Sequence, residues 1–278
     1  MIGRIGFSRA SAACALALAF CFAPALAQPA GTVSVLYAGS LVTPMEGPIK
    51  TALAAAGVEF QGEPGGSKML ANLIASGAKN PDTFVSVDPK LVTGLGAKVT
   101  SATAFASTSL GIGWSSHSRY AATFDAVTAG KSSLLAALGT PGLTIGRTDP
   151  KLDPKGEYTV EGMTILASAG GEHRILGDDE NPAQTFPEED LLVRIETGQA
   201  DVGFFYKTEA IARGLHFAPL PGAASMSEKI TYVIAIMKNA PHPAQAKAFQ
   251  DFLLAGSGKH ILQSAGLEYF DVPRVLVR

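Results

Sequence analysis

The 278-residue chain is poor in charge and has no surplus of positive residues. Charged residues make up 17% of it, and 22 lysines and arginines stand against 24 aspartates and glutamates. Proteins that wrap nucleic acid carry a clear basic surplus, so this balance argues against a nucleic-acid partner. Glycine (30) and proline (17) fall well short of the level found in disordered or collagen-like chains. The length suits one large or two medium globular domains.

The chain also lacks a long apolar run, except near its N-terminus. There Arg4 and Arg9 precede an uncharged stretch at 10–23, and Ala25-Leu26-Ala27 forms a small-x-small cleavage site. This pattern is typical of a secretory signal peptide. An uncleaved anchor helix is the alternative, but the apolar stretch is short for a span and Pro24 interrupts its end. We therefore expect residues 1–27 to be a signal peptide that is cleaved after Ala27.

Cysteine is almost absent. The two copies, Cys14 and Cys21, both lie inside the expected signal peptide. The mature protein would then have no disulfide, no cysteine nucleophile and no metal site of the cysteine type. Phe20 before Cys21 does not fit the small residues that precede an acylated cysteine. We expect an exported protein, with the bacterial periplasm as its compartment.

Strand-like and helix-like patterns alternate along the first part of the mature chain. Residues 32–37, 58–60 and 83–87 are short apolar or alternating runs typical of strands. Residues 44–56 and 68–75 have helical character, and Ser67 stands where it could cap the second helix. This order of elements is typical of a parallel α/β layer.

A second α/β block follows. Strands are expected at 109–114, 143–146 and 201–206, and helices at 158–169 and 189–196. Two such blocks with a helical pair after them predict an α/β fold of two lobes that hold a ligand between them. The remaining elements are a strand at 230–237 and helices at 243–254 and 258–265.

Patterns that would indicate an enzyme are weak. Ser76 to Lys79 has the serine–lysine spacing of penicillin-binding enzymes, but no matching Ser-Asp-Asn or Lys-Thr-Gly element follows. Gly256 to Lys259 lacks the first glycine of a phosphate loop. No Gly-x-Ser-x-Gly sequence occurs, and no two histidines have metal-ligand spacing. We expect no enzyme and no resident cofactor or metal. The five histidines are His117, His173, His216, His242 and His260.

Three short segments share the chemistry of anion binding. Gly39-Ser40 follows the first strand, Gly66-Ser67 opens a helix, and Asp153-Pro154-Lys155-Gly156 opens another helix in the second block. Free N–H groups and the positive end of the helix dipole favour an anion at such positions. Ordinary capping and turn chemistry would explain each segment taken alone. Their joint occurrence after strands in both blocks favours an oxyanion site.

The sequence resembles the periplasmic molybdate/tungstate-binding proteins of ABC importers, in particular the tungstate branch. The resemblance covers most of the mature chain in the expected order. It is carried by residues 35–41 (Val-Leu-Tyr-Ala-Gly-Ser-Leu), 64–67 (Pro-Gly-Gly-Ser), 85–88 (Val-Ser-Val-Asp), 105–110 (Phe-Ala-Ser-Thr-Ser-Leu), 148–156 (Thr-Asp-Pro-Lys-Leu-Asp-Pro-Lys-Gly), 201–207 (Asp-Val-Gly-Phe-Phe-Tyr-Lys) and 238–243 (Lys-Asn-Ala-Pro-His-Pro).

The resemblance implies a type II periplasmic binding fold in which each lobe is a mixed sheet flanked by helices. Lobe I would comprise 28–107 and 236–278 and lobe II 108–235, with crossings near 106–109 and 231–235. Ser40 and Ser67 would donate from lobe I, and Asp153 and the segment around Tyr206 would face them. The ligand-binding set implied in this way is Gly39, Ser40, Gly66, Ser67, Asp153, Gly156 and Tyr206.

One position departs from the family pattern. The tungstate branch completes the metal's shell with two carboxylates, and Asp153 matches the first, whereas Phe205 stands at the position of the second. This favours a tetrahedral anion held by hydrogen bonds, or a different solute. An ionised Asp153 would repel an anion unless it contacts the metal of the oxyanion or is protonated. Alternatively, Asp153 caps its own helix.

The resulting hypothesis is a monomeric receptor that closes on molybdate or tungstate and delivers it to an ABC permease at the inner membrane. Within the same class, the solute could be sulfate, a phosphonate, a small organic acid or ferric ion. Ferric binding would require clustered tyrosines, whereas Tyr37, Tyr158 and Tyr206 are far apart in sequence. A different class, an exported hydrolase using Ser67 or Ser40, would need a positioned general base.

Overall fold

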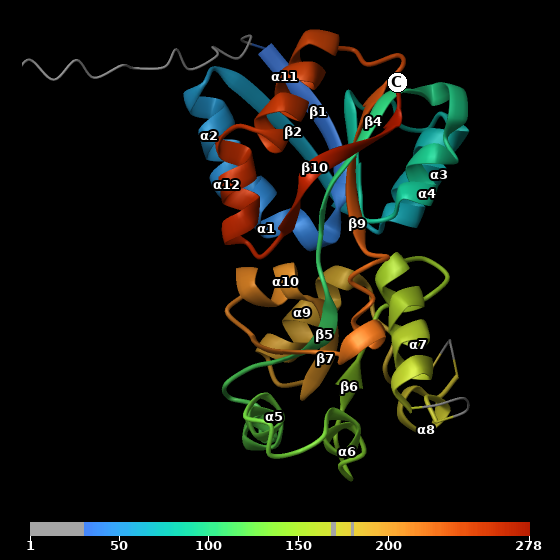
Figure 1. Ribbon diagram of the computed structural model, residues 1–278, viewed down its shortest axis with the longest axis vertical. Coiled ribbons are helices and arrows are strands. Elements are labelled where there is room, and N and C mark those ends of the chain that lie inside the picture. The colour runs from blue at the N-terminus through green and yellow to red at the C-terminus, as the bar shows by residue number, and fades with distance from the viewer. Residues whose placement is uncertain (1–30, 168–170, 179–180) are drawn as a thin grey trace, which may run out of the picture.

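The protein consists of two α/β lobes, one above the other in Figure 1. The computed structural model describes residues 31–167, 171–178 and 181–278, so the expected signal peptide and Ala169 lie outside the described residues. Two mixed sheets flanked by helices confirm the predicted fold class. Within the described ranges, no helix combines the length and the apolar character that crossing a membrane requires.

Lobe one, defined as residues 31–107 and 231–278, is built on a six-stranded sheet in the order β10-β4-β9-β3-β1-β2. β1 pairs in parallel with β2 and β3, which confirms the parallel layer expected at the start of the chain. β9 and β10 pair antiparallel to their neighbours. The strands are β1 (Gly31–Ala38), β2 (Val58–Gly65), β3 (Thr83–Ser86), β4 (Val99–Ser107), β9 (Thr231–Met237) and β10 (Glu268–Val277).

Helices cover both faces of this sheet, so its central strands are apolar on both sides. Val33, Val35 and Tyr37 of β1 belong to the larger core cluster with Phe249, whereas Leu36 belongs to the other cluster. This is the two-residue period of a strand. One face carries η1 (Gly39–Leu41), α1 (Val42–Pro44), η2 (Met45–Ile49), α2 (Lys50–Ala55), α11 (Pro243–Leu254) and α12 (Ser257–Ser264), and the other α3 (Ser67–Ser76), α4 (Pro89–Thr93) and η3 (Gly96–Lys98).

Lobe two, residues 108–230, has a four-stranded sheet in the order β6-β7-β5-β8. β6 and β7 run parallel, and β5 runs antiparallel to β7 and β8. Its strands are β5 (Leu110–Trp114), β6 (Ile145–Gly146), β7 (Val202–Tyr206) and β8 (His216–Pro219). Its helices are α5 (Ala121–Thr128), α6 (Leu134–Leu138), α7 (Pro154–Ala167), α8 (His173–Leu176), α9 (Glu188–Glu196), α10 (Lys207–Ala212) and η4 (Gly222–Ser225).

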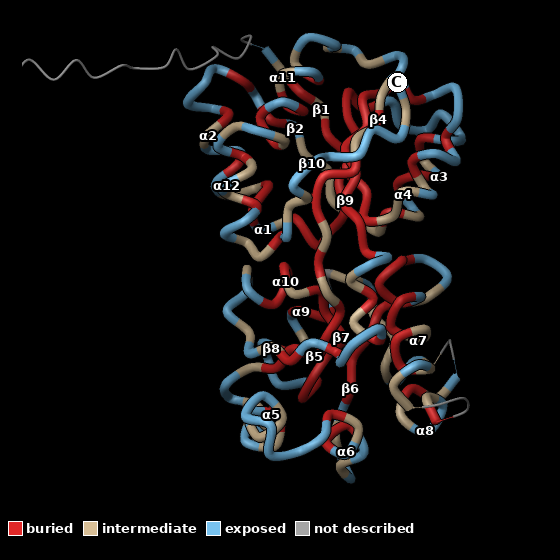
Figure 2. Tube along the Cα trace, in the orientation of Figure 1, coloured by how far each residue is buried: buried red, intermediate tan, exposed pale blue. Residues whose placement is uncertain are grey.

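Two crossings join the lobes. β4 continues almost directly into β5, and the chain returns through η4 into β9 (Figure 1). All of β9 pairs with β3 and β4, so residues 231–235 belong to the first sheet and not to lobe II, where we expected them. β9 is buried throughout (Figure 2). A uniformly apolar run does not show at which residue the chain passes from one lobe to the other, so the predicted boundary fell inside the strand.

The C-terminal helices were predicted closely, but the last strand was missed. α11 and α12 lie where the helical patterns placed them. β10 follows them and pairs with β4, with a break in register between Tyr269 and Arg274. It is an edge strand whose residues are mostly exposed, and Pro273 interrupts it, so the alternation that marks a half-buried strand is absent.

Asp82 links the residue before α11 to the first strand of lobe one through hydrogen bonds. Its buried carboxylate accepts the Ser34 N–H at 2.7 Å, the His242 N–H at 2.5 Å and His242 Nδ1 at 2.9 Å. These bonds hold the start of α11 beside β1 and β3. Because one buried carboxylate satisfies donors from two segments, its loss leaves those donors unpaired.

We predict that Asp82→Ala lowers the free energy of unfolding by about 3 kcal/mol, from lost charge-assisted hydrogen bonds. The control is Asp251→Ala, which removes an exposed carboxylate on α11 paired with Lys247 and should cost less than about 1 kcal/mol. Urea unfolding followed by circular dichroism measures both. Equal losses in the two variants would contradict the structural role of Asp82.

Candidate functional site

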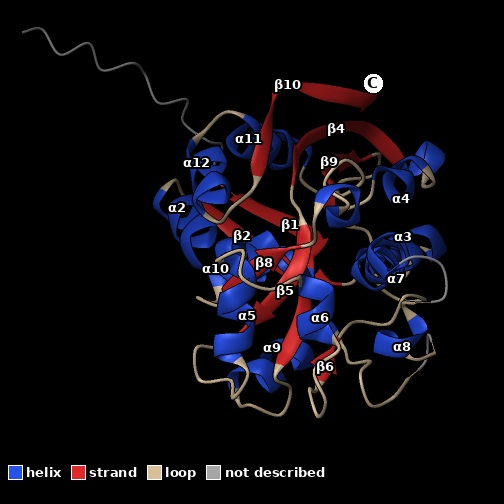
Figure 3. Ribbon diagram, turned by 60° about the horizontal axis from the view of Figure 1, so that its bottom comes forward, coloured by secondary structure: helices blue, strands red, loops and turns tan. Residues whose placement is uncertain are grey.

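The predicted anion-binding segments meet at the seam between the lobes. Lys68 at the start of α3 donates to Glu157 of α7 at 2.5 Å and to the Pro150 carbonyl at 3.1 Å, so these helices face each other across the seam (Figures 1 and 3). A β-carbon added at Gly66 would lie 3.1 Å from the Leu152 carbonyl oxygen. Gly66 therefore lets the turn before α3 approach the segment before α7.

Gly39 makes the second close approach. A β-carbon at this position would overlap the carboxylate of Glu188, the first residue of α9. Gly39 begins the helical run that follows β1, where backbone N–H groups have no partner within the helix. The absence of a side chain at Gly39 thus brings a lobe-two carboxylate against a helix start of lobe one.

A chain of buried hydroxyl groups crosses the seam near the hinge. Ser40 Oγ lies 3.0 Å from the Tyr232 hydroxyl, and Thr208 Oγ1 of α10 lies 3.3 Å from the same hydroxyl. Thr208 also donates to Thr108 Oγ1 at 3.4 Å, at the β4–β5 crossing. Each hydroxyl is both donor and acceptor, so the chain can reorient its protons toward a ligand. Tyr232 and Thr208 were not among the predicted site residues.

Ser67 is buried, but its predicted capping role is wrong. Gly66 occupies the N-cap position of α3 and Ser67 is the first helical residue, with no side-chain cap. The Ser67 hydroxyl oxygen instead accepts the Val87 N–H at 3.3 Å, which fixes the side chain against the end of β3. The hydroxyl proton is thereby left to donate elsewhere.

Asp153 caps its own helix and keeps one oxygen unused. Oδ1 accepts the Lys155 N–H at 2.9 Å, as the capping alternative required. Oδ2 is buried and has no hydrogen-bond partner among the residues that the structure describes. Gly156 lies one turn further on, where a β-carbon would come within 2.6 Å of the Asp149–Pro150 backbone. Close packing within lobe two therefore accounts for Gly156.

Tyr206, at the end of β7, places a second unpaired polar atom in the same region. Its side chain is fully buried, and within the described part of the chain its hydroxyl has no hydrogen-bond partner. Burial, and next the negative charge of Asp153, raise the pKa of the Tyr206 hydroxyl well above its ordinary value, so it remains a donor at all physiological pH. Burying polar atoms without partners is costly, and such atoms are common at ligand sites.

A buried cation with two carboxylates lies beneath these groups, and sequence reasoning missed it. Lys155 Nζ lies 2.6 Å from Glu209 Oε1 and 3.1 Å from Glu188 Oε1, with no solvent exposure; we call these three residues the Lys155 cluster. Glu209 also accepts the Tyr206 N–H at 2.8 Å. The spacing from Tyr206 to Glu209 is that of a capping box, which was an available signal for Glu209.

Glu188 supplies the second carboxylate that Phe205 lacks. It comes from the start of α9 and not from β7, and no sequence signal linked it to Asp153. The Phe205 ring centroid lies 5.6 Å from Lys155 Nζ, so this phenyl group packs against the buried cation. The site therefore has two carboxylates, Asp153 and Glu188, even though the expected second position is aromatic.

Burial governs the charge of the Lys155 cluster. Burial, opposed by Lys155 and reinforced by Glu209, raises the pKa of the Glu188 carboxyl to about 8. Burial and the Glu188 charge raise the pKa of Asp153 to about 6, against the effect of Lys155. Burial alone would lower the pKa of Lys155, but the facing carboxylates keep it above its ordinary value. The lysine is thus a fixed cation, and the two carboxyls gain protons readily.

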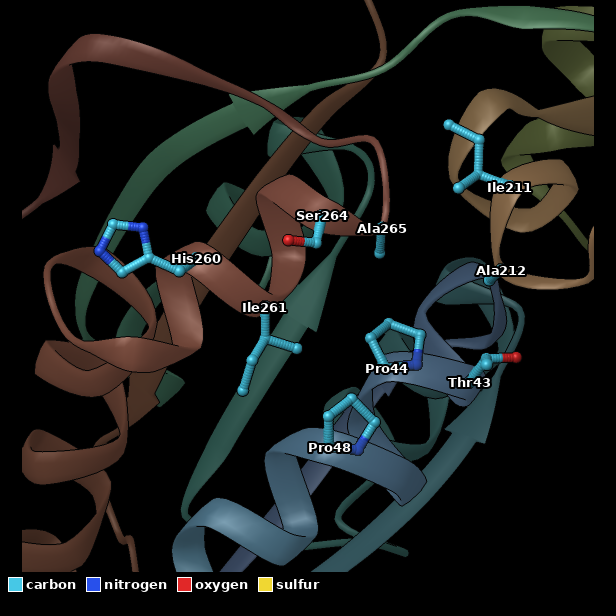
Figure 4. A pocket seen from close by; sticks show the side chains of 9 residues that line it. All are labelled: Thr43, Pro44, Pro48, Ile211, Ala212, His260, Ile261, Ser264 and Ala265. Carbon is cyan, nitrogen blue, oxygen red and sulfur yellow. The ribbon is translucent and has the colours of Figure 1, made fainter.

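A second groove lies elsewhere on the seam, and its mainly apolar lining does not suit an anion. Its volume is about 430 Å³, and it lies between α10 and α12 (Figure 4). It is lined mainly by apolar side chains such as Ile211, Ile261, Pro44 and Pro48, and it contains none of the predicted site residues. This groove is therefore not the candidate anion site.

We predict that stability falls between pH 4.5 and 8 in part because of Glu188. A carboxyl whose pKa is raised from 4.5 to about 8 on folding binds a proton in the folded state that the unfolded state has lost, so folding weakens as pH rises through this window. In Glu188→Gln this loss should shrink by up to about 5 kcal/mol at pH 8, because each unit between the two pKa values corresponds to about 1.4 kcal/mol. Thermal unfolding at several pH values measures it, with the exposed neighbour Asp190→Asn as control. Parallel pH profiles of wild type and Glu188→Gln would contradict the assignment.

Comparison with known proteins agrees with this architecture. The family model "Bacterial extracellular solute-binding protein" matches residues 33–268. An uncharacterised solute-binding protein of Halobacterium salinarum is 28% identical over 263 residues, covering 85% of this chain and 84% of that protein. A putative ABC transporter molybdenum-binding protein of Haloferax volcanii is 27% identical over 201 residues, covering 72% and 63%.

A solved structure shows the same fold. The periplasmic molybdate-binding protein of Azotobacter vinelandii superposes with a TM-score of 0.61 at 18% identity, covering 87% of this chain and 99% of that one. With the family match over most of its length, the resemblance seen in the sequence is confirmed at the family level. The chain belongs to the bacterial extracellular solute-binding proteins.

Proposed function

We propose that this protein is the periplasmic receptor of an ABC importer and that it captures a tetrahedral oxyanion of the molybdate/tungstate class between its lobes. The observation that carries the proposal is the convergence of buried hydroxyls and unpaired polar atoms from both lobes at one seam. Ser40 and Ser67 contribute from lobe one, and Asp153 and Tyr206 from lobe two. The molybdenum-binding relative and the molybdate-binding structure support the choice of anion.

Hydroxyl donors and helix starts hold such an anion without a cation in direct contact. The N–H groups at the starts of η1 and α3 carry partial positive charge toward the seam. The raised pKa values of Asp153 and Glu188 allow these carboxyls to be protonated beside a dianion and so to donate hydrogen bonds. The buried ammonium group of Lys155, which pairs with Glu209, supplies positive charge behind these groups.

A ligand that contacts both lobes stabilises the closed arrangement, and the permease then receives the loaded receptor. Closure requires only that the ligand makes more favourable contacts with the closed state than with the open state. The two crossings provide the hinge, and the Ser40–Tyr232–Thr208 chain lies beside it. No step changes the ligand chemically.

The hydrolase alternative receives no support from the geometry. Ser40 pairs with Tyr232, and Ser67 pairs with the Val87 N–H. A serine nucleophile requires a base within hydrogen-bonding reach. All five histidines bond elsewhere or lie at the surface; His242, for example, bonds Asp82. A binding function is therefore favoured.

The first test is calorimetric titration with molybdate, tungstate, sulfate and phosphate. We expect one-to-one binding of molybdate and tungstate, weakened tenfold to about a hundredfold in Ser40→Ala or Ser67→Ala, since a hydrogen bond to a charged group contributes about 1.5–3 kcal/mol. Ser76→Ala, which changes an exposed serine at the end of α3, is the control. Binding of sulfate or phosphate alone would reassign the solute, and no binding of any of the four would reject the oxyanion proposal.

Tyr206→Phe separates binding from stability. Removing a buried hydroxyl that has no protein partner should raise the free energy of unfolding by about 1 kcal/mol. The same change should weaken oxyanion binding by about tenfold, because the donor is lost. The control is Tyr269→Phe, whose hydroxyl bonds the Leu253 carbonyl at 2.8 Å and which should lose stability and keep its affinity. A Tyr206→Phe variant that binds as tightly as wild type would remove Tyr206 from the site.

A further inference from the structure

A cavity of about 300 Å³ opens beside the oxyanion site, on the side of α3 and α7. It shares Gly66, Asp153 and Glu188 with that site, so the two are continuous. Both lobes form its walls: the β2–α3 turn with Met69 on one side, and the segments before α7 and α9 on the other. The cavity is thus continuous with the candidate oxyanion site and is formed by both lobes.

Beyond the shared residues, the walls of this cavity are mostly apolar, with Thr148, Asp149 and Thr185 as their polar members. Met69 of lobe one and Leu152 of lobe two are 46% and 62% exposed, and both line it. Phe186 forms part of the lobe-two wall, where the Arg194 guanidinium lies 4.1 Å from its ring centroid. A further contact fixes the lobe-one wall, since a β-carbon at Gly65 would lie 2.7 Å from Met69 Cε. Large exposed apolar side chains that line one cavity favour an apolar ligand group.

The size of the cavity exceeds what an inorganic oxyanion needs. Its volume corresponds to about ten water molecules at ~30 Å³ each. A tetrahedral oxyanion has only a central atom and its oxygens, and it bonds polar groups, whereas Met69, Leu152 and Phe186 offer none. An oxyanion seated at the helix starts therefore leaves the apolar part of the cleft unfilled.

We propose that the cleft binds oxyanions that carry one small apolar organic substituent, such as phosphonates or phosphate monoesters. The oxyanion group lies against Ser40, Ser67 and the helix starts, and the substituent lies between Met69, Leu152 and Phe186. The inference rests on the oxyanion seat of the proposed function and not on molybdate being its natural occupant. Apolar contact between the substituent and both lobes adds affinity and also favours closure.

The test compares two phosphonates that share an oxyanion group. Calorimetry with the purified protein should show phenylphosphonate binding at least tenfold more tightly than methylphosphonate, because only the phenyl ring reaches the apolar walls. Leu152→Ser should bring the ratio of the two affinities close to one, and Phe186→Ala should do the same. Leu152 is exposed, so its replacement leaves the fold intact even if Phe186→Ala does not fold.

The matched control is Val193→Ser, which removes a similarly exposed apolar side chain of lobe two that does not line the cavity. This variant should keep the wild-type ratio. Equal affinity for the two phosphonates, or exclusion of phenylphosphonate while molybdate binds, would overturn the inference and leave the proposed function intact. Tight phenylphosphonate binding that depends on Leu152, without molybdate binding, would support the inference and reject the anion assigned above.

Discussion

The arrangement of the site depends on one buried charge, the ammonium group of Lys155. A lysine without solvent exposure is tolerated only when acidic groups face it, and Glu209 at 2.6 Å and Glu188 at 3.1 Å do so from two different helices. These contacts hold α7, α9 and α10 together at the ends that point toward lobe one. The cluster fixes the backbone of Asp153, Tyr206 and Glu188, the lobe-two residues to which the proposed function assigns the ligand.

The same charge gives the site its electrostatic character. Lobe one offers hydroxyls and helix starts but no buried cation at the seam, whereas lobe two brings acids together with their counter-ion. An anion is therefore met by partial charges and by carboxyls that protonate easily, while the full positive charge lies one layer behind. In the proposed function the anion is thus held without a strong direct ion pair, which suits a receptor that must later release its ligand.

Much of the fold followed from sequence, because its central strands and amphipathic helices carry clear periodicity; α11 was predicted with its bounds. β10 was missed because an exposed edge strand interrupted by Pro273 has no such pattern. In the site, the sequence pattern predicts the turn and helix-start residues Gly39, Ser40, Gly66 and Ser67. No such pattern marks Glu188, which in sequence is an ordinary glutamate in the first turn of a helix. Only its tertiary contacts with Gly39 and Lys155 bring it to the site.

The order of strands in the first sheet has a consequence for how the molecule forms. β9 lies between β3 and β4 and β10 covers the outer edge of β4, so the sheet is interleaved with strands made after all of lobe two. Lobe two is one continuous stretch of sequence and can fold before the rest of the chain follows. Lobe one cannot complete its sheet until β9 and β10 are present. Such long sequence separations slow folding. Lobe one therefore stays open at its centre until β9 has been inserted between β3 and β4, whereas the sheet of lobe two closes without any later strand.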